Sequence, residues 1–142
     1  MTRSPPTAEL APFVASLSAD DLPDRRRRLA ERAVLDTVGV TLAGLDAPAT
    51  TAARRALDAE SETGGAFLAG TAGHALDFDD VCLAGMDGHP SVTMVAPALL
   101  VGAATDATGA DLLAAYVAGF ETQCYLAAPI SPGHYEGGWQ AT

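Results

Sequence analysis

The sequence contains no lysine, and all eight of its basic residues are arginines that lie between Arg3 and Arg55. Residues 56–142 therefore carry no basic side chain, although they carry eleven Asp and Glu residues. A surface that binds nucleic acid needs clustered cations to displace the counterions of the phosphates, so this portion cannot form one. The only basic run, residues 25–28, is best interpreted as the solvated face of a helix. We expect no nucleic-acid partner.

Long hydrophobic runs and cysteine-rich motifs are also missing. The longest uncharged apolar stretch, residues 92–104, is interrupted by Pro97 and is shorter than the roughly 18 residues that a membrane-spanning helix needs. No apolar run follows Arg3, so a secretory leader is not expected. The two cysteines, Cys82 and Cys124, have neither zinc-site nor redox-motif spacing. We expect reduced thiols, no membrane partner and a cytoplasmic location.

The composition favours one folded domain over residues 1–142, because 49% of the residues are hydrophobic and only 18% are charged, despite a net charge of −10. Apolar residues recur at three and four positions, and no segment alternates with period two. The pattern therefore predicts an all-α chain. The expected helices cover residues 8–17, 23–44, 50–60, a short segment after residue 71, then 91–105 and 108–128, with Thr7, Ser91 and Thr108 as N-caps.

Helices this rich in Ala and Gly bury little area each, so they need several neighbours to reach ordinary stability. We therefore expect the core to be completed by a further segment or by another polypeptide. A homodimer is one such solution, and the apolar helix around Tyr116 and Phe120 is its expected contact surface.

The segment GHALDFDDVCLAGMDGHPS, residues 73–91, contains two of the three histidines and four carboxylates. If it is helical, His74 and Asp77 share one face and Asp80 lies one turn further on. His89 follows a glycine-containing loop, and Ser91 opens a helix whose free N–H groups attract anions. Imidazole and carboxylate together can abstract a proton beside a carboxylate group near neutral pH.

Each of these features also has a structural interpretation. Asp77, Asp79 and Asp80 fit a solvated helix end, and either histidine fits a purely structural role. A divalent ion held by His74, Asp77, Asp80 and His89 is conceivable, but neither HExxH nor a calcium-loop pattern occurs. We therefore predict no metal site. The third histidine, His134, has glycine close on both sides and is interpreted as a loop residue.

Five stretches together resemble the MmgE/PrpD family, which includes 2-methylcitrate dehydratase, cis-aconitate decarboxylase and iminodisuccinate epimerase. They are LDTVGVTLAG, GTAGHALDFDD, GHPSVTMVAPALL, TGADLLAAYVAGFE and HYEGGWQAT. Each motif alone is weak, whereas their order and spacing are specific and cover nearly the whole chain. The resemblance implies the N-terminal part of a large helical domain without the family's smaller α+β lid, homodimers, and no organic cofactor.

The resemblance also implies site residues. Asp77 matches the first Asp of the LDFDD motif and His89 matches the His of HPS, both of which line the family's active site. Ser91, Asp80 and His74 are expected to contact substrate beside them. Gln140 stands where the family usually has a catalytic histidine, so it can hydrogen-bond to substrate but cannot act as an acid or base.

The function implied is proton abstraction from a small polycarboxylic acid, followed by dehydration, decarboxylation or epimerisation. Val81 stands where decarboxylase-like members carry Thr, and the family's later Lys and Tyr have no counterpart. We therefore expect a lyase-like part that needs a further segment or a complementary lid-bearing polypeptide, and that is weak or inactive alone. The alternative is a catalytically silent helical module that dimerises or binds a partner.

Overall fold

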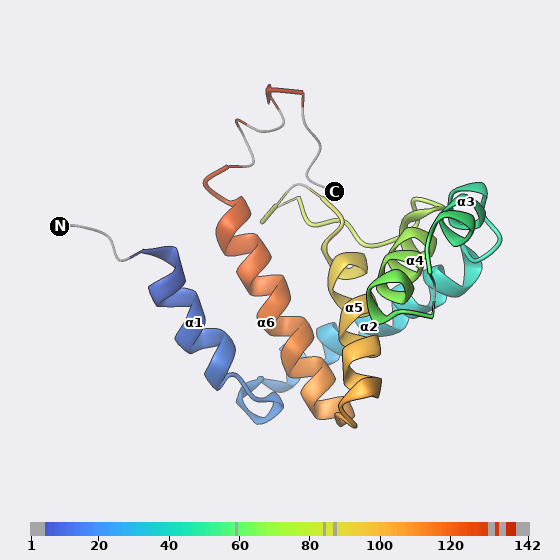
Figure 1. Ribbon diagram of the computed structural model, residues 1–142. Coiled ribbons are helices and arrows are strands. Elements are labelled where there is room, and N and C mark those ends of the chain that lie inside the picture. Colours follow the sequence, from blue (N-terminus) through green and yellow to red (C-terminus); the bar gives the residue numbers. More distant parts are fainter. Residues whose placement is uncertain are drawn as a thin grey trace.

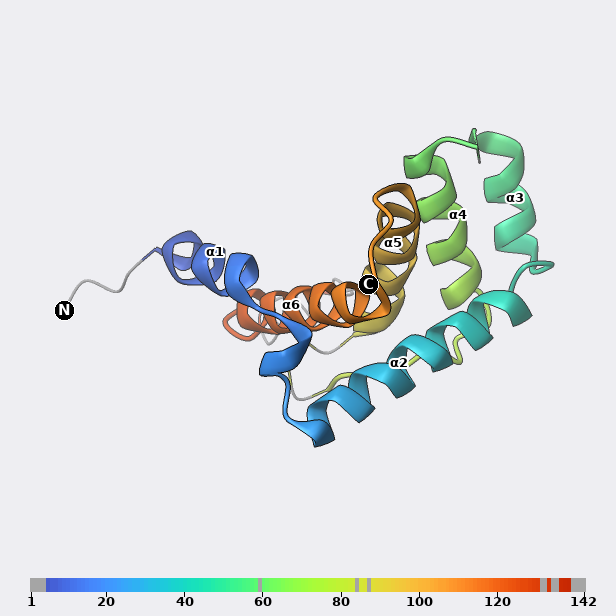
Figure 2. The same ribbon diagram turned by 90° about the horizontal axis from the view of Figure 1, so that it is seen from below.

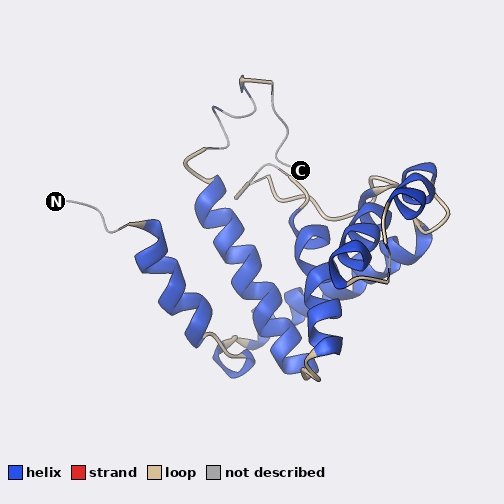
Figure 3. Cartoon of the chain, in the orientation of Figure 1, coloured by secondary structure: helices blue, strands red, loops and turns tan. Residues whose placement is uncertain are grey.

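The computed structural model of the chain describes residues 5–58, 60–83, 85–86, 88–130, 133 and 136–138, and within these the architecture is helical without strands (Figure 3). The α-helices are α1 (Pro6–Ser16), α2 (Asp24–Ala43), α3 (Pro48–Ala56), α4 (Glu62–His74), α5 (Pro90–Ala104) and α6 (Gly109–Ala127), with a 3-10 turn η1 (Ala19–Asp21). The predicted all-α fold is confirmed.

The helices are arranged around α2, which contacts α4, α5 and α6. Helices α4, α5 and α6 pack in that order, α3 lies against α4 at one end, and α1 lies against α6 at the other (Figures 1 and 2). None of the helices in the described ranges combines the length and the apolar character that crossing a membrane requires.

The core lies where α2, α5 and α6 meet, and it is built around Ala30, Val95 and Tyr116. Partly buried apolar side chains of the same three helices pack against these residues: Ala33, Val34 and Val38 of α2, Met94 of α5, and Leu113, Val117 and Phe120 of α6. Part of the α6 surface that was expected to form a dimer contact therefore packs inside the chain, and the dimer itself stays a prediction.

Two helix starts differ from the expected ones because proline, not a polar cap, begins each helix. Helix α1 starts at Pro6, so Thr7 lies inside the first turn. Helix α5 starts at Pro90 with His89 at the N-cap position, so Ser91 does not cap it. Proline suits the first helical position because its missing N–H would have no partner there. The predicted Thr108 cap is confirmed, since its side chain accepts a hydrogen bond from the Asp111 N–H at 3.2 Å.

Helix α4 is longer at its N-terminal end than predicted and stops before the Asp-rich motif. The Ser61 side chain caps it by accepting a hydrogen bond from the Gly64 N–H at 3.1 Å. Near its other end Gly73 packs against α2 and α5 so closely that a Cβ there would lie 2.6 Å from Val92 Cγ2 and 2.9 Å from Thr41 Oγ1. Glycine at this position lets α4 approach both helices, and this fixes where the following residue, His74, lies.

Candidate functional site

The loop that joins α4 to α5 carries the Asp-rich motif, and it is not helical. Helix α4 ends at His74, and the Asp77 N–H donates to the His74 carbonyl at 3.0 Å to close a turn. Asp77 has φ of 55°, a left-handed conformation that non-glycine residues rarely adopt. The expected shared helix face of His74 and Asp77 is therefore wrong, and a turn brings them together instead. Phe78, the next residue, is 75% exposed and does not anchor the turn in the core.

Asp79 is the central residue of the site, and its side chain is 0% exposed. Its two carboxylate oxygens lie 3.1 and 3.0 Å from Nδ1 of His74, and Oδ1 lies 3.5 Å from Nδ1 of His89. Sequence reasoning missed this residue, because Asp79 was interpreted only as part of a solvated helix end. Asp79 is the same residue type as Asp77 and Asp80, so the sequence does not distinguish it from them. Its burial depends on where α4 ends, which is set by tertiary packing.

His89 joins the site from the start of α5, and it is mostly buried. Its Nε2 lies 3.6 Å from Oδ1 of Asp77, whose side chain is 80% exposed, so the two residues that the resemblance implied as site residues lie close together. The rings of His74 and His89 meet edge to face, with centroids 4.8 Å apart and planes at 61°. The buried Nδ1 of His89 has no hydrogen-bond partner. We call the four residues His74, Asp77, Asp79 and His89 the His/Asp cluster.

The His/Asp cluster offers one ligand atom from each side chain, and these four atoms lie within 4.8 Å of one another. Imidazole nitrogens and carboxylate oxygens are common ligands of divalent metals. The same groups can also transfer protons. In the described part of the chain the ion pairs of Asp77 and Asp79 are formed with imidazoles and not with arginine.

Asp80 and Ser91 form a separate hydrogen-bonded group with Tyr116 of α6. The Ser91 N–H and hydroxyl donate to the Asp80 carboxylate at 3.1 and 2.6 Å. The Ser91 oxygen lies 2.8 Å from the Tyr116 hydroxyl. Because the Ser91 proton is given to Asp80, Tyr116 is the donor of this second bond. We call these three residues the Ser91 network.

The Ser91 network changes how the start of α5 is interpreted. Ser91 is fully buried, and its N–H is already bonded to Asp80, so it is not a free anion-binding group. Burial raises the pKa of Tyr116 above its usual value, while the hydrogen bond with Ser91 acts in the opposite direction. Substrate contacts by Asp80 and Ser91 stay a prediction, but in this structure the two side chains face each other. Gln140 and His134 lie outside the described residues.

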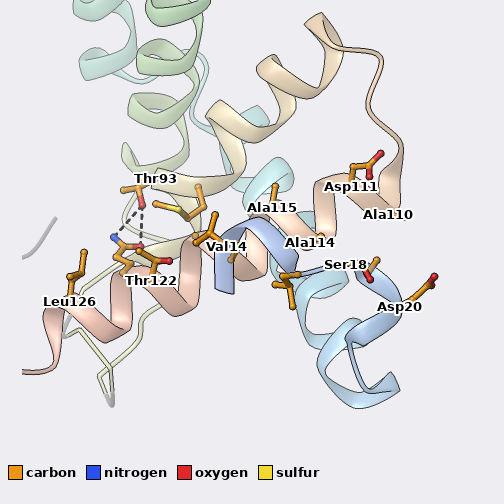
Figure 4. A pocket seen from close by; sticks show the side chains of 16 residues that line it. Val14, Ser18, Asp20, Thr93, Ala110, Asp111, Ala114, Ala115, Thr122 and Leu126 are labelled. Atoms are coloured by element: carbon orange, nitrogen blue, oxygen red, sulfur yellow. Dashed lines mark hydrogen bonds between the residues drawn. The ribbon is translucent and has the colours of Figure 1, made fainter. Parts of the chain in front are cut away.

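A larger groove lies elsewhere, between α1, η1 and α6, with a volume of about 980 Å³ (Figure 4). Its walls are mainly small apolar side chains, such as Ala114 and Ala118. A long contact of 3.3 Å between Thr93 and Gln123 crosses one end. No histidine lines this groove. A smaller hollow of about 330 Å³ is lined by His74, Val92 and Thr93, among others, and it therefore borders the His/Asp cluster.

Comparisons with known proteins place this site in a family. The MmgE/PrpD N-terminal domain matches the chain over residues 8–66 and 61–142, two stretches that overlap at residues 61–66. Neither the curated proteins nor the solved structures give a match. Because the matched stretches together cover almost the whole chain, including both groups of side chains at the start of α5, the chain belongs to the MmgE/PrpD N-terminal domain family.

Proposed function

We propose that the chain is the helical part of a lyase-like enzyme that abstracts a proton beside a carboxylate of a small polycarboxylic acid. The observation that carries the proposal is the convergence of two imidazoles on the buried Asp79 carboxylate, with Asp77 beside Nε2 of His89. A carboxylate that is hydrogen-bonded to one nitrogen of an imidazole orients the ring and leaves the other nitrogen available to take a proton. Asp79 makes such bonds with His74.

The roles follow from exposure and contact. His89 is the proposed base, because its Nε2 faces the exposed Asp77 rather than the buried Asp79. Asp79 positions the His74 ring through hydrogen bonds with its Nδ1, and His74 is the proposed second proton carrier. The Ser91 network holds the start of α5, and thereby the backbone from which His89 projects, in place.

The proposed partner is a further polypeptide segment that supplies positive charge. Charge that develops on a substrate carboxylate needs electrostatic stabilisation, and residues 56–142 contain no Lys or Arg. By resemblance to the family, a lid domain with cationic residues would provide it. We therefore propose that the chain acts with a lid-bearing segment or polypeptide.

The test is hydrogen exchange, because proton abstraction can occur without the complete reaction. The chelator-treated chain is incubated in D₂O with citrate, methylcitrate or tricarballylate, and loss of the proton signals beside the carboxylates is followed by NMR. We expect slow exchange above the buffer rate that falls about 100-fold or more in His89→Gln. Asp106→Asn, which removes an exposed carboxylate outside the cluster, is the control. Exchange at the buffer rate in the unsubstituted chain would contradict the proposal.

A second candidate function, a silent module that dimerises, is favoured by one observation. Large apolar side chains are exposed on the outer faces of several helices, among them Leu35 and Leu42 of α2, Phe67 of α4 and Val101 of α5. Exposed apolar area of this kind is typical of protein contacts. We propose a homodimer that covers exposed side chains of this kind, with Leu42 among its contacts. Light scattering at micromolar concentration should give twice the chain mass, and Leu42→Glu should give the monomer. A monomer without any substitution would contradict it.

A further inference from the structure

We propose that the His/Asp cluster binds one divalent transition-metal ion. Metal–nitrogen and metal–oxygen bonds of about 2.0–2.2 Å place neighbouring ligand atoms of a tetrahedral site about 3.4 Å apart. One ion binds a single nitrogen of each imidazole. Asp79 lies 3.0 Å from Nδ1 of His74 and 3.5 Å from Nδ1 of His89, close to the separation that such a site requires. One ligand atom from each of the four side chains lies within 4.8 Å of the others, so the widest separation must shorten for all four to surround one ion.

The ligand types define the class of metal. Two imidazoles with two carboxylates suit Zn²⁺, Co²⁺, Ni²⁺ or Fe²⁺, whereas Mg²⁺ and Ca²⁺ prefer sites made of oxygen alone. Two ionised carboxylates and two neutral imidazoles carry a charge of −2, which a divalent ion neutralises. Sequence reasoning placed Asp80 in a conceivable metal site, but the structure uses Asp79 there and turns Asp80 toward Ser91.

Two further observations favour a cation at this position. Asp79 is a carboxylate with 0% of its side chain exposed, and a buried charge is costly unless an opposite charge compensates it. Its ion-pair partners in the described residues are imidazoles alone, which are neutral unless protonated. In addition, Nδ1 of His89 is buried without a hydrogen-bond partner, although it lies beside this carboxylate. A metal ion would use both groups.

The inference rests on this geometry and not on the proposed activity. If the activity is also correct, the ion would supply positive charge where residues 56–142 have no basic side chain. Metal binding and proton exchange are measured by different methods, and exchange is measured on the chelator-treated chain. Failure of one proposal therefore does not decide the other.

The experiment is a titration of the chelator-treated, tag-free chain with Zn²⁺ by calorimetry and with Co²⁺ by visible absorption. We expect one ion per chain and a dissociation constant in the micromolar range or below. His74→Ala and Asp79→Asn should each weaken binding by at least about 10- to 100-fold. Asp106→Asn is the matched control for loss of a carboxylate, and its affinity should be unchanged.

The two thiols provide a second control. Cys82 and Cys124 are free and lie near the same loop, so they could bind the ion instead. The Cys82→Ser/Cys124→Ser double variant should retain full affinity, and the Co²⁺ spectrum should lack the strong near-ultraviolet band of thiolate ligation. Loss of binding in this variant would overturn the assignment.

Circular dichroism establishes that each variant is folded before it is titrated. If a variant does not fold, the unsubstituted chain still tests the proposal, because Co²⁺ should shift and broaden the NMR signals of the His74 and His89 rings but not those of His134. Absence of one-to-one binding, affinity unchanged in Asp79→Asn, or effects on His134 alone would each overturn the proposal.

Discussion

Asp79 and Asp80 are adjacent in the sequence, yet Asp79 belongs to the His/Asp cluster and Asp80 to the Ser91 network, and their hydrogen-bond partners differ in chemical type. Asp79 lies between two imidazoles, which can gain and lose protons near neutral pH. Asp80 accepts hydrogen bonds from the Ser91 N–H and hydroxyl, which do not change charge near neutral pH. The His/Asp cluster is therefore suited to binding and proton transfer, whereas the Ser91 network is suited to holding α5 against α6.

The two regions also depend on each other. His89 and Ser91 are separated only by Pro90, the first residue of α5. The Ser91 network fixes this helix start from the side of α6, and His89 then reaches Asp79 and Asp77 on the other side. Substitutions in the Ser91 network should therefore mainly change stability, whereas substitutions in the His/Asp cluster should mainly change binding and proton transfer.

The largest expected effect concerns turnover. We expect turnover to need a further acid or base and a cationic group in addition to the His/Asp cluster. We expect the isolated chain to dehydrate, decarboxylate or epimerise small polycarboxylates slowly or not at all, and Gln140→His not to restore turnover. The rate falls about 100- to 10,000-fold when one general acid or base is absent, as where Gln140 replaces histidine. It falls about 100- to 1000-fold more when one donor that stabilises the developing charge is absent. Ultraviolet absorbance of the unsaturated acid measures it, with methylcitrate, citrate and cis-aconitate offered separately. Robust turnover would contradict the prediction.

The second largest effect, about 100-fold, is expected in the alkylation rate of the Cys124 thiol. Cys124 lies near the Ser91 network, because its charge, like that of Asp80, contributes to raising the pKa of Tyr116. Burial, with a further contribution from Cys82, raises the pKa of Cys124 to about 11 from 9.0. Because only the thiolate reacts, alkylation at pH 8 should be about 100-fold slower than for a thiol of ordinary pKa. The rate should rise about tenfold per pH unit up to about pH 11. Mass spectrometry of the Cys124 peptide measures it.

The unfolded chain is the control for Cys124. In denaturant the same peptide should be alkylated at the ordinary rate, since burial no longer disfavours the thiolate. Equal rates in the folded and the unfolded chain would contradict the prediction, because they would show that the Cys124 thiol is open to solvent in the folded chain.

Ser91→Ala should reduce the free energy of unfolding by about 1–3 kcal/mol, because it removes the hydroxyl between the Asp80 carboxylate and the Tyr116 hydroxyl and leaves buried groups without partners. Thr93→Ala is the matched control on the same helix, since Thr93 is exposed and its hydroxyl bonds the local Pro90 carbonyl. Urea denaturation measures both. A larger loss for Thr93→Ala would contradict the structural role of the Ser91 network.

The smallest effect is expected at Asp77. Asp77→Gly should leave the free energy of unfolding unchanged or raise it by up to about 1 kcal/mol, because glycine adopts positive φ without a steric penalty. The same change at Asp106, which has φ of 59°, should have a similar effect on stability. Only Asp77→Gly should weaken Co²⁺ binding. Equal affinities in the two variants would remove Asp77 from the His/Asp cluster.

Part of this arrangement could be predicted from the sequence. Helical periodicity predicted the fold, and the Thr108–Asp111 pair predicted the start of α6, which is set by a local hydrogen bond. The two residues that the family resemblance implied as site residues, Asp77 and His89, lie close together. The roles of Asp79 and Asp80 could not be assigned, because residue type does not reveal which of two adjacent carboxylates becomes buried.

The sequence by itself determined the all-α class, most of the helices and the uneven distribution of charge, because periodicity, caps and composition act over short distances along the chain. Only the tertiary structure decided the site. Close packing of Gly73 against α2 and α5 fixes the end of α4, and contacts between α5 and α6 bury Ser91 beside Tyr116. These contacts join residues that are distant in sequence, so they select Asp79 for the imidazoles and Asp80 for the hydroxyls.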